Sequence, residues 1–458
     1  MEKQARATGK ISLAVTTVLL LLWTCQAHSA SLTLRQCIIE ALRNSPAMNA
    51  GAFDTEAARE EITRKRATTL PYLRGGLDTY EVNGAPLTPF EVLNVFEPGN
   101  GGGRNAHWGP AAIQSLQMSV PVFQYGSILG LNHPPVVEIA RTQASQQEWT
   151  NVLTQEKVVQ QVATAFFTAQ SFEKQAATLR ELSEVLRRIS DIMRQDAAYG
   201  LKLQQDLELA ESQLSASEHN AVAANNNARF AIMQLLVLLG RLGDERVRLA
   251  NENGPVRALP PVAELLSDIV HRHPAIRIQQ HNVDIAFQQA RIERANLWPT
   301  ASIQTIAGAG EDLNYIDGGS RHRRPTLFMT GLQVEIPLFD FGQRRAAVRQ
   351  AEAKVNSARA RLKEVELELR TAIIQLYSDI SGLDQQVRIL QTDYLKAYNA
   401  AQLAQERRGQ GAADELTYLQ AESAMLVARL SLQSIALKKA LKYAELTEAS
   451  GGVWDWME

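Results

Sequence analysis

Apolar and polar side chains alternate along two short stretches of the chain, residues 113–122 and 328–338. Successive side chains of a β-strand point to opposite faces, so a period of two predicts strands with one apolar face. The apolar positions are Leu116, Met118 and Val120 in the first stretch and Phe328, Leu332, Val334 and Ile336 in the second. Weaker alternation in residues 72–82 and 300–309 marks the expected partner strands. The chain is therefore predicted to carry two β-hairpins with long polar loops.

A helical pattern follows the second hairpin, where apolar side chains recur in alternate steps of three and four. One extra step of four after Leu369 is a stutter in an otherwise regular coiled-coil seam. A helix from Gly342 to Arg407 would have about 65 residues and measure about 95 Å at 1.5 Å per residue, far more than an ordinary globular helix. The seam positions are Val348, Ala351, Val355, Ala358, Leu362, Val365, Leu369, Ile373, Leu376, Ile380, Leu383, Val387, Leu390, Tyr394, Ala397 and Ala401.

The same series of features occurs twice along the chain. Each series has a proline, a second proline 25 residues later, the motif Pro-x-Phe-x-x-Gly, a glycine, and Ala-Glu-Ser starting ten residues after that glycine. The two series are Pro46, Pro71, residues 121–126, Gly200 and residues 210–212, and then Pro274, Pro299, residues 337–342, Gly411 and residues 421–423. Five matches in one order indicate a tandem duplication of about 220 residues, each copy forming one structural unit.

The duplication predicts the organisation of the chain. Each repeat should contain helices, then a hairpin, then two long helices joined by a glycine turn. The leading helices are expected at residues 32–45 and 47–69 in the first repeat and at 262–272 and 275–297 in the second. The expected segments are a signal peptide (1–30), the first repeat (31–240), a linker (241–261), the second repeat (262–450) and a C-terminal tail (451–458).

The N-terminus reads as a secretory signal peptide, because a basic segment precedes an apolar run at residues 11–23 and small residues follow. Cys25 would either leave with this peptide or carry a lipid. If Cys25 is removed, Cys37 is the single cysteine of the mature chain and no intrachain disulfide is possible. Later residues contain no run of 18 apolar side chains, so no transmembrane helix is expected. A membrane location would therefore require a β-barrel.

The net charge, the missing motifs and the histidine spacing argue against nucleic-acid binding, enzymatic activity and metal binding. The formal net charge of the 458 residues is -2, which gives no support to nucleic-acid binding. Phosphate-loop, nucleophile-elbow and zinc-protease motifs are all missing from the sequence. His271 and His273 lie two apart on an expected helix and so point in different directions, which makes a poor metal pair. We therefore expect no enzyme, no cofactor and no metal site.

Two hairpins supply four strands, which cannot close a barrel, and open strand edges are not viable in lipid. Three chains would supply twelve strands, an even number within the range of bacterial barrels. Strands of about 10 residues are long enough to span a bilayer. Shared hairpins and very long helices together suggest a conduit through an outer membrane into the periplasm.

Several segments resemble the outer-membrane efflux protein family typified by TolC. They are "LTLRQCIIEALRNSP" (32–46), "VAELLSDIVHRHP" (262–274), "VPVFQYG", "IPLFDFG", "AYGLKLQQDLELAESQL" (198–214), "GQGAADELTYLQAESAM" (409–425) and "LTEASGGVW" (446–454). The resemblance covers nearly all of residues 32–454, and its specificity lies in the order and duplication of these segments.

The resemblance implies a mainly α fold with a β-hairpin pair, in which a homotrimer builds a twelve-stranded outer-membrane β-barrel and a periplasmic α-barrel of coiled-coil helices. It implies an exit duct that conducts substrates passively from a periplasmic adaptor (membrane fusion) protein and an inner-membrane pump of RND or ABC type to the exterior. Its surroundings would be outer-membrane lipid and the periplasm of a Gram-negative bacterium. A soluble periplasmic coiled-coil scaffold or adaptor is the alternative, although it would not need apolar strands.

Glycines permit tight reversals between antiparallel helices, so the turns at residues 198–202 and 407–412 are expected at the periplasmic tips. The resemblance makes these tips the adaptor-docking surface, with Gly200, Leu201, Gly409, Gln410 and Gly411 as contact candidates. The glycines could equally serve only to make the turns. Exposed Leu201 favours a contact, because an apolar side chain at a turn usually has a partner.

The resemblance also places a pore constriction on the helices that return from the tips, often with aspartates six and nine residues after the turn glycine. Asp206 fits position six of the first repeat, but Thr417 and Gln420 occupy these positions in the second, with Asp414 nearby. Three copies of Asp206 around one axis would favour cations. A solvated surface aspartate is the alternative reading.

The motif Pro-x-Phe-x-x-Gly is expected at both strand-to-helix junctions. Pro121 and Pro337 lack a backbone donor and should end strands, while Gly126 and Gly342 should let the chain bend into a long helix. The aromatic residues Phe123, Tyr125, Phe339 and Phe341 would lie at the membrane interface or simply pack the junction. Pro134 and Pro135 interrupt the first junction, so the first long helix should begin near Pro135.

Overall fold

The computed structural model describes residues 31–82, 109–131, 133–241, 247–251, 259–312 and 326–451. The expected signal peptide with Cys25, most of the expected linker and nearly all of the C-terminal tail lie outside the described residues. In the described ranges, no helix is both long enough and apolar enough to cross a membrane.

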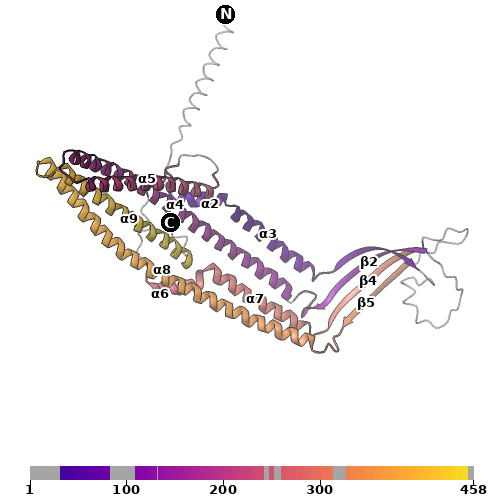
Figure 1. Cartoon of the computed structure of the whole chain (residues 1–458). Helices are drawn as coiled ribbons and strands as arrows, with labels where there is room; N and C mark the ends of the chain where they lie inside the picture. The colour runs from indigo at the N-terminus through magenta and orange to yellow at the C-terminus, as the bar shows by residue number, and fades with distance from the viewer. Residues whose placement is uncertain are drawn as a thin grey trace, which may run out of the picture. The chain divides into compact units, whose positions relative to one another are not determined.

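The two halves of the chain present the same series of elements (Figure 1). The first half contains α2 (Leu34–Asn44), α3 (Pro46–Ala67), β1 (Tyr72–Val82), β2 (Gly109–Gln124), β3 (Ser127–Ile128), α4 (Pro135–Ala198) and α5 (Gln204–Leu238). The second half contains α6 (Val262–Arg272), α7 (Pro274–Ala295), β4 (Thr300–Asp312), β5 (Thr326–Glu335), α8 (Gln343–Gly409) and α9 (Glu415–Ser450). Only the short strand β3 has no counterpart among the described elements of the second half.

The chain divides into two compact units, and the long helices α4 and α8 contribute to both. The sheet unit comprises residues 50–152 and 274–368, and the tip unit comprises residues 1–49, 153–273 and 369–458. The sheet unit holds the four long strands, and the tip unit holds both helical reversals.

Helix α2 anchors the core of the tip unit. Its capping box begins at Thr33, and its apolar stripe packs on α4 and α5. Leu34, Cys37, Ile38 and Ala41 of this stripe are buried with Phe166, Leu235 and Leu239. Arg241 donates to both carboxylate oxygens of Glu40 at 2.5 and 2.9 Å, which fixes the end of α5 beside α2. Cys37 is buried and its side chain forms part of this apolar core.

Helix α8 confirms the coiled-coil prediction. It contains 67 residues, and every predicted seam position from Val348 to Ala401 is buried or half-buried. The helix starts at Gln343, directly after Gly342, and the first long helix starts at Pro135, as the proline pair predicted.

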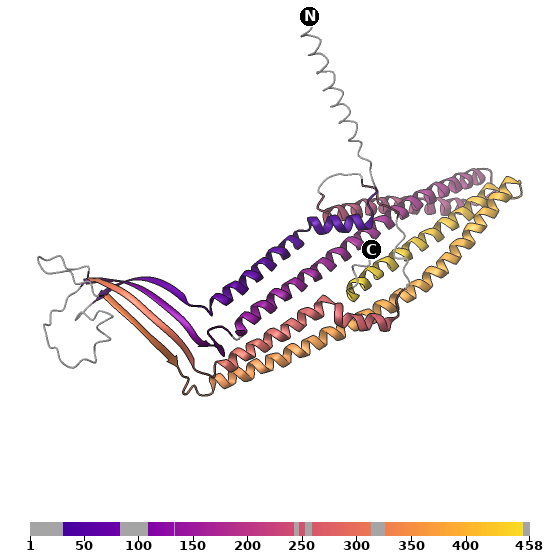
Figure 2. The ribbon, with the colours of Figure 1, turned by 180° about the vertical axis from the view of Figure 1, so that it is seen from behind.

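The four long strands form one antiparallel sheet in the order β1–β2–β4–β5 (Figures 1 and 2). The helices of the sheet unit follow the same order. Asn151 of α4 donates to the backbone oxygen of Gly51 in α3 at 2.9 Å, and Gln146 donates to Asn282 of α7 at 2.8 Å. Arg294 of α7 pairs with Glu352 of α8 at 2.6 Å. Each strand is thus continued by a helix held to its neighbours.

Candidate functional site

The sheet has one apolar and one polar face, as the alternation predicted. Paired residues of adjacent strands point to the same face. Leu73 pairs with Met118, and Ile303 pairs with Leu332, so these side chains share a face. That face includes the polar residue Gln114, which pairs with Leu77. Its other side chains include Leu73, Leu77, Leu116, Met118, Val120, Ile303, Thr305, Ala307, Phe328, Thr330, Leu332 and Val334. Many of these large apolar side chains are exposed, with Phe328 at 75% and Leu332 at 66%.

The opposite face of the sheet is mainly polar, although Ile306 and Met329 also lie on it. Arg74 donates to the side chain of Gln117 at 2.9 Å, and the side chains of Gln304 and Gln333 are hydrogen bonded to each other. An exposed apolar face of this extent is unusual for a protein surrounded by water. A sheet with lipid on one side and water on the other has this pattern.

Both outer edges of the sheet lack a partner strand within the described chain. β1 pairs only with β2, and β5 pairs only with β4. Unpaired edges of long strands present free backbone donors and acceptors and favour pairing with another chain.

The first strand-to-helix junction differs from expectation at Pro121. Pro121 lies inside β2 instead of ending it, and β2 continues to Gln124. The strand tolerates the missing donor because its register with β4 shifts between Pro121 and Phe123. The chain then turns through Tyr125 and Gly126, which have φ values of 52° and 74°, before pairing again in β3. Positive φ at both central residues is what a type I′ hairpin turn requires.

The second junction uses the same backbone turn without a following strand. Phe341 and Gly342 have φ values of 51° and 87°. The Asp340 carboxylate accepts hydrogen bonds from the backbone N–H groups of Gly342 at 3.0 Å and Arg344 at 3.1 Å, which caps the start of α8. Pro337 lies after the end of β5 at Glu335, as expected. The repeated glycine therefore supplies a left-handed conformation in both copies.

The two junctions expose their apolar side chains unequally. Leu338, Phe339 and Phe341 are 90%, 78% and 92% exposed, whereas Phe123 and Tyr125 are half-buried. Phe339 and Phe341 also contact each other edge to face, with ring centroids 4.5 Å apart. The second junction thus carries a projecting apolar cluster.

The first tip joins α4 to α5 through a Schellman motif at Gly200, whose φ is 73°. Its N–H donates to the carbonyl of Ala197 at 3.0 Å, and the N–H of Leu201 donates to the carbonyl of Asp196 at 2.8 Å. Tyr199, Leu201 and Leu203 are 81%, 71% and 69% exposed around this turn. The first tip is therefore apolar.

The second tip has the same backbone but different side chains. Gly411, at φ 74°, closes a Schellman motif with Arg407 and Arg408, while Gly409 is the last residue of α8 and Gln410 begins the reversal. Arg408 pairs with Glu415 at 2.8 Å and lies over the ring of Tyr418, 4.3 Å from its centroid. Alanines take the positions after the turn glycine, so this tip is small and charged.

The constriction candidates lie at the starts of α5 and α9, with Asp414 as the N-cap of α9 and Gln420 in its second turn. Asp206 and Gln420 are exposed in the single chain. Asp414 is the N-cap of α9 and accepts a hydrogen bond from the N–H of Thr417 at 3.0 Å. Hydrogen bonds from the side chain and backbone of Thr417 lower the pKa of Asp414. Asp414 and Thr417 therefore act together as a helix cap, whereas Asp206 is exposed in the first turn of α5.

A buried group of titratable residues in the tip unit carries no sequence signal. Glu156 of α4 is only 2% exposed, and its Oε2 atom has no hydrogen-bond partner in the described chain. Burial, and then the charge of Glu448 on α9, raise its pKa to about 7. His273, the C-cap of α6, is buried beside Glu448, and burial lowers its pKa to about 4.

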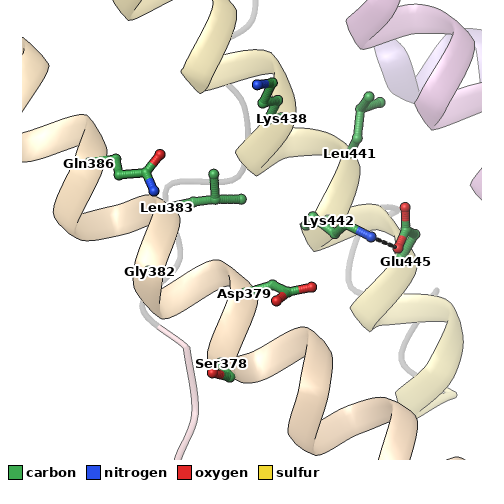
Figure 3. Close-up of a pocket in the computed structure, with 9 residues that line it drawn as sticks. All are labelled: Ser378, Asp379, Gly382, Leu383, Gln386, Lys438, Leu441, Lys442 and Glu445. Atoms are coloured by element: carbon green, nitrogen blue, oxygen red, sulfur yellow. Dashed lines mark hydrogen bonds and ion pairs between the residues drawn. The ribbon is translucent and has the colours of Figure 1, made fainter.

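A cleft of about 490 Å³ opens between α8 and α9 beside Gly382 (Figure 3). The side chain of Asp379 points across it toward Lys442 and Glu445, which pair at 2.6 Å. Its acidic and basic side chains balance, so it offers no selective chemistry for one ligand. The lining residues are Ser378, Asp379, Gly382, Leu383, Gln386, Lys438, Leu441, Lys442 and Glu445.

Known proteins share these features. The family model of the outer membrane efflux protein matches residues 37–241 and 265–452. CyaE of Bordetella pertussis is 28% identical over 48% of this chain and 46% of that protein. TtgC of Pseudomonas putida, named as a probable efflux pump outer membrane protein, is 20% identical over 92% of this chain and 83% of that protein.

The solved structure of the outer membrane protein VceC from Vibrio cholerae has the same fold, with a TM-score of 0.70. It is 18% identical and covers 92% of this chain and 96% of that chain. The family match spans both repeats and includes the strands, both tips and the buried group. This chain belongs to the outer membrane efflux protein family.

Proposed function

We propose that three copies of this chain form an outer-membrane exit duct that carries substrates passively out of the cell. One observation carries the proposal, namely an amphipathic four-stranded sheet whose two outer edges are unpaired. Membership of an efflux family supports it and agrees with the expectation that the chain is not an enzyme.

Joining three sheets edge to edge would remove every open edge. The strands alternate in direction, so β5 of one copy runs antiparallel to β1 of the next and can pair with it. The closed sheet would contain twelve strands, with its apolar face toward lipid and its polar face toward the lumen. Arg74, Gln117, Gln304 and Gln333 would then meet water inside the duct.

The helices support assembly in the periplasm. Phe230, Met233 and Val237 of α5 are 58%, 56% and 64% exposed, and Ile389 of α8 is 62% exposed. Rows of exposed apolar side chains along such long helices favour burial against further helices. Neighbouring copies would cover them and enclose a tunnel. A soluble scaffold would also use such helices but would leave the apolar sheet face unexplained.

The duct would receive substrates from a periplasmic adaptor and an inner-membrane pump, which supplies the energy. The described chain presents no cluster of residues suited to a metal ion, and its family is one of efflux proteins. The apolar first tip is the surface that such an adaptor would bind, through Tyr199, Leu201 and Leu203.

Fractionation and mass measurement test the duct. The protein should remain in the outer-membrane pellet after a high-salt wash, dissolve only in detergent, and have the mass of three chains by light scattering. Release by salt, or a monomer in mild detergent, would exclude a shared membrane sheet.

The tip can be tested separately. Replacing Leu201 with Ser should weaken binding of the trimer to the adaptor of its pump by about tenfold or more, because burying a leucine contributes about 1.5–3 kcal/mol. Lys202→Gln, in the same turn, is the matched control because it removes no apolar side chain. Both variants should remain trimeric. Equal affinity of the Leu201 variant and the wild type would remove this tip from the interface.

A further inference from the structure

Basic side chains gather at the two edges of the sheet, where strands meet helices. Helix α3 ends with Arg64, Lys65 and Arg66 just before edge strand β1, and α8 begins with Arg344 and Arg345 just after edge strand β5. The first turn of α8 contains no acidic residue. Both edges of the sheet therefore continue into strongly positive segments.

Few acidic residues lie beside these basic segments, and Asp340 interacts electrostatically with both Arg344 and Arg345. Glu61 accepts from Arg64 and lies 3.7 Å from Lys65, while Asp340 caps α8 beside Arg344. Arg66, Arg345 and Arg349 are exposed and make no ion pair with a described residue. Arg345 and Arg349 also lie four residues apart, on one face of α8, where like charges repel.

The inner junctions differ from the edges. Glu138, near the start of α4, pairs with Arg141 at 2.6 Å, and Glu352 pairs with Arg294 of α7 at 2.6 Å. Charge at the middle of the sheet is therefore compensated within the chain. Exposed arginines that make no ion pair with a described residue thus lie at both outer edges.

Edge-to-edge assembly would bring the two positive segments together. In the proposed trimer, β1 of one copy lies beside β5 of the next, so α3 of one copy adjoins α8 of its neighbour. Each seam would combine Arg66 from one copy with Arg345 and Arg349 from the next. This step rests on the proposed function, because a single chain keeps these arginines at opposite edges of its sheet.

Exposed apolar side chains lie at one side of the same seam. Leu338, Phe339 and Phe341 project between β5 and α8. Aromatic residues beside arginines are typical of the boundary between acyl chains and headgroups. An apolar cluster next to unpaired arginines fits a lipid, because a lipid supplies both a chain and a phosphate.

We propose that each seam between neighbouring copies binds the headgroups of anionic phospholipids in the membrane leaflet at the level of the junction. Arg66, Arg345 and Arg349 contact the phosphates, and the Leu338–Phe341 segment inserts between the acyl chains. Guanidinium groups match phosphate oxygens in geometry and charge. The bound lipid would also offset the repulsion between positive segments of adjacent copies, and so favour the closed assembly.

Native mass spectrometry of the detergent-purified assembly tests this site. Phosphatidylglycerol or phosphatidylcholine is titrated into the wild type, the triple variant R66Q/R345Q/R349Q, and the control variant R359Q/R361Q/K363Q. The control removes the same charge from exposed positions further along α8. The wild type and control should prefer phosphatidylglycerol by about tenfold or more at low salt, and the triple variant should lose that preference.

Three outcomes would overturn the proposal. The first is that the triple variant keeps its full preference for phosphatidylglycerol. The second is that the control variant loses this preference to the same extent. The third is that inorganic phosphate fully displaces the lipid, which would indicate a simple anion site. The same spectra report the number of chains. A wild type that is not trimeric contradicts the duct itself, whereas a trimer with no preference for anionic lipid contradicts only the lipid site.

Discussion

Replacing Leu332 with Arg is expected to prevent stable insertion of the protein into the outer membrane. Leu332 lies on the apolar face of the sheet and is 66% exposed in the single chain. An arginine on the lipid face of a membrane strand costs about 2–4 kcal/mol at the middle of the bilayer and less near its surfaces. Three copies would each introduce this cost, so the trimer should be depleted from the membrane fraction.

The adjacent residue provides the control. Gln333 points to the opposite, polar face, where its side chain is hydrogen bonded to Gln304. Gln333→Arg adds the same charge one residue away and should still insert, because that face would meet water. The measurement is the amount of heat-modifiable trimer in outer-membrane fractions. Equal insertion of both variants would show that the apolar face does not meet lipid.

Replacing Glu156 with Gln is expected to stabilise the tip unit at alkaline pH by about 3 kcal/mol. The pKa of Glu156 is about 7 in the folded chain, well above its ordinary value of 4.5, because the carboxyl is buried. Between these values the folded state binds more protons than the unfolded state, so stability falls as pH rises from about 4.5 to 7. A glutamine is neutral throughout and avoids this loss.

In the wild type, neighbouring titratable groups partly cancel the fall in stability with pH that Glu156 causes. The pKa of His273 is lowered to about 4, so its contribution to stability rises with pH between about 4 and 6.5, opposite in sign to that of Glu156. Glu448, whose own pKa is raised by burial, and Lys157 face the same group. The diagnostic quantity is therefore the difference in unfolding free energy between variant and wild type at each pH.

Urea unfolding followed by helical circular dichroism from pH 5 to pH 8 measures this difference. It should be small near pH 5 and grow toward pH 8. Glu184→Gln is the matched control, an exposed glutamate on the same helix, and should show no such growth. A constant difference for the Glu156 variant would mean that its carboxyl titrates normally.

Periodic patterns predicted the elements because each pattern reflects one continuous environment. The strands alternate because one face of the sheet is mainly apolar, and the α8 seam repeats because its positions are buried or half-buried along the helix. The start of α4 at Pro135 was also predictable, since proline suits the first turn of a helix.

Local geometry at the junctions was less predictable. Pro121 is compatible with the interior of β2 only because the register shifts beside it, and pairing register depends on a distant strand. Positive φ at Tyr125 and Phe341 carries no sequence signal, because aromatic residues rarely adopt it. Each turn has two residues with positive φ, and the sequence predicted only the second of them, the glycine.

The site residues divide in the same way. The exposed apolar tip at Leu201 followed from a local turn, whereas Asp414 was expected near a pore constriction and is the N-cap of α9. The group around Glu156 could not be predicted from the sequence, because its residues come from α4, α9 and the end of α6, which are far apart in the chain. Contacts between such distant segments produce no repeating pattern of apolar and polar residues in the sequence.

The two tips of one chain differ in chemistry although they share a backbone motif. Tyr199, Leu201 and Leu203 surround the first, whereas Arg408 and Glu415 surround the second. A trimer would therefore present six tips in strict alternation around its mouth, three of each kind. A partner whose binding surface fits only the apolar tips would occupy every second position and saturate at one partner per chain.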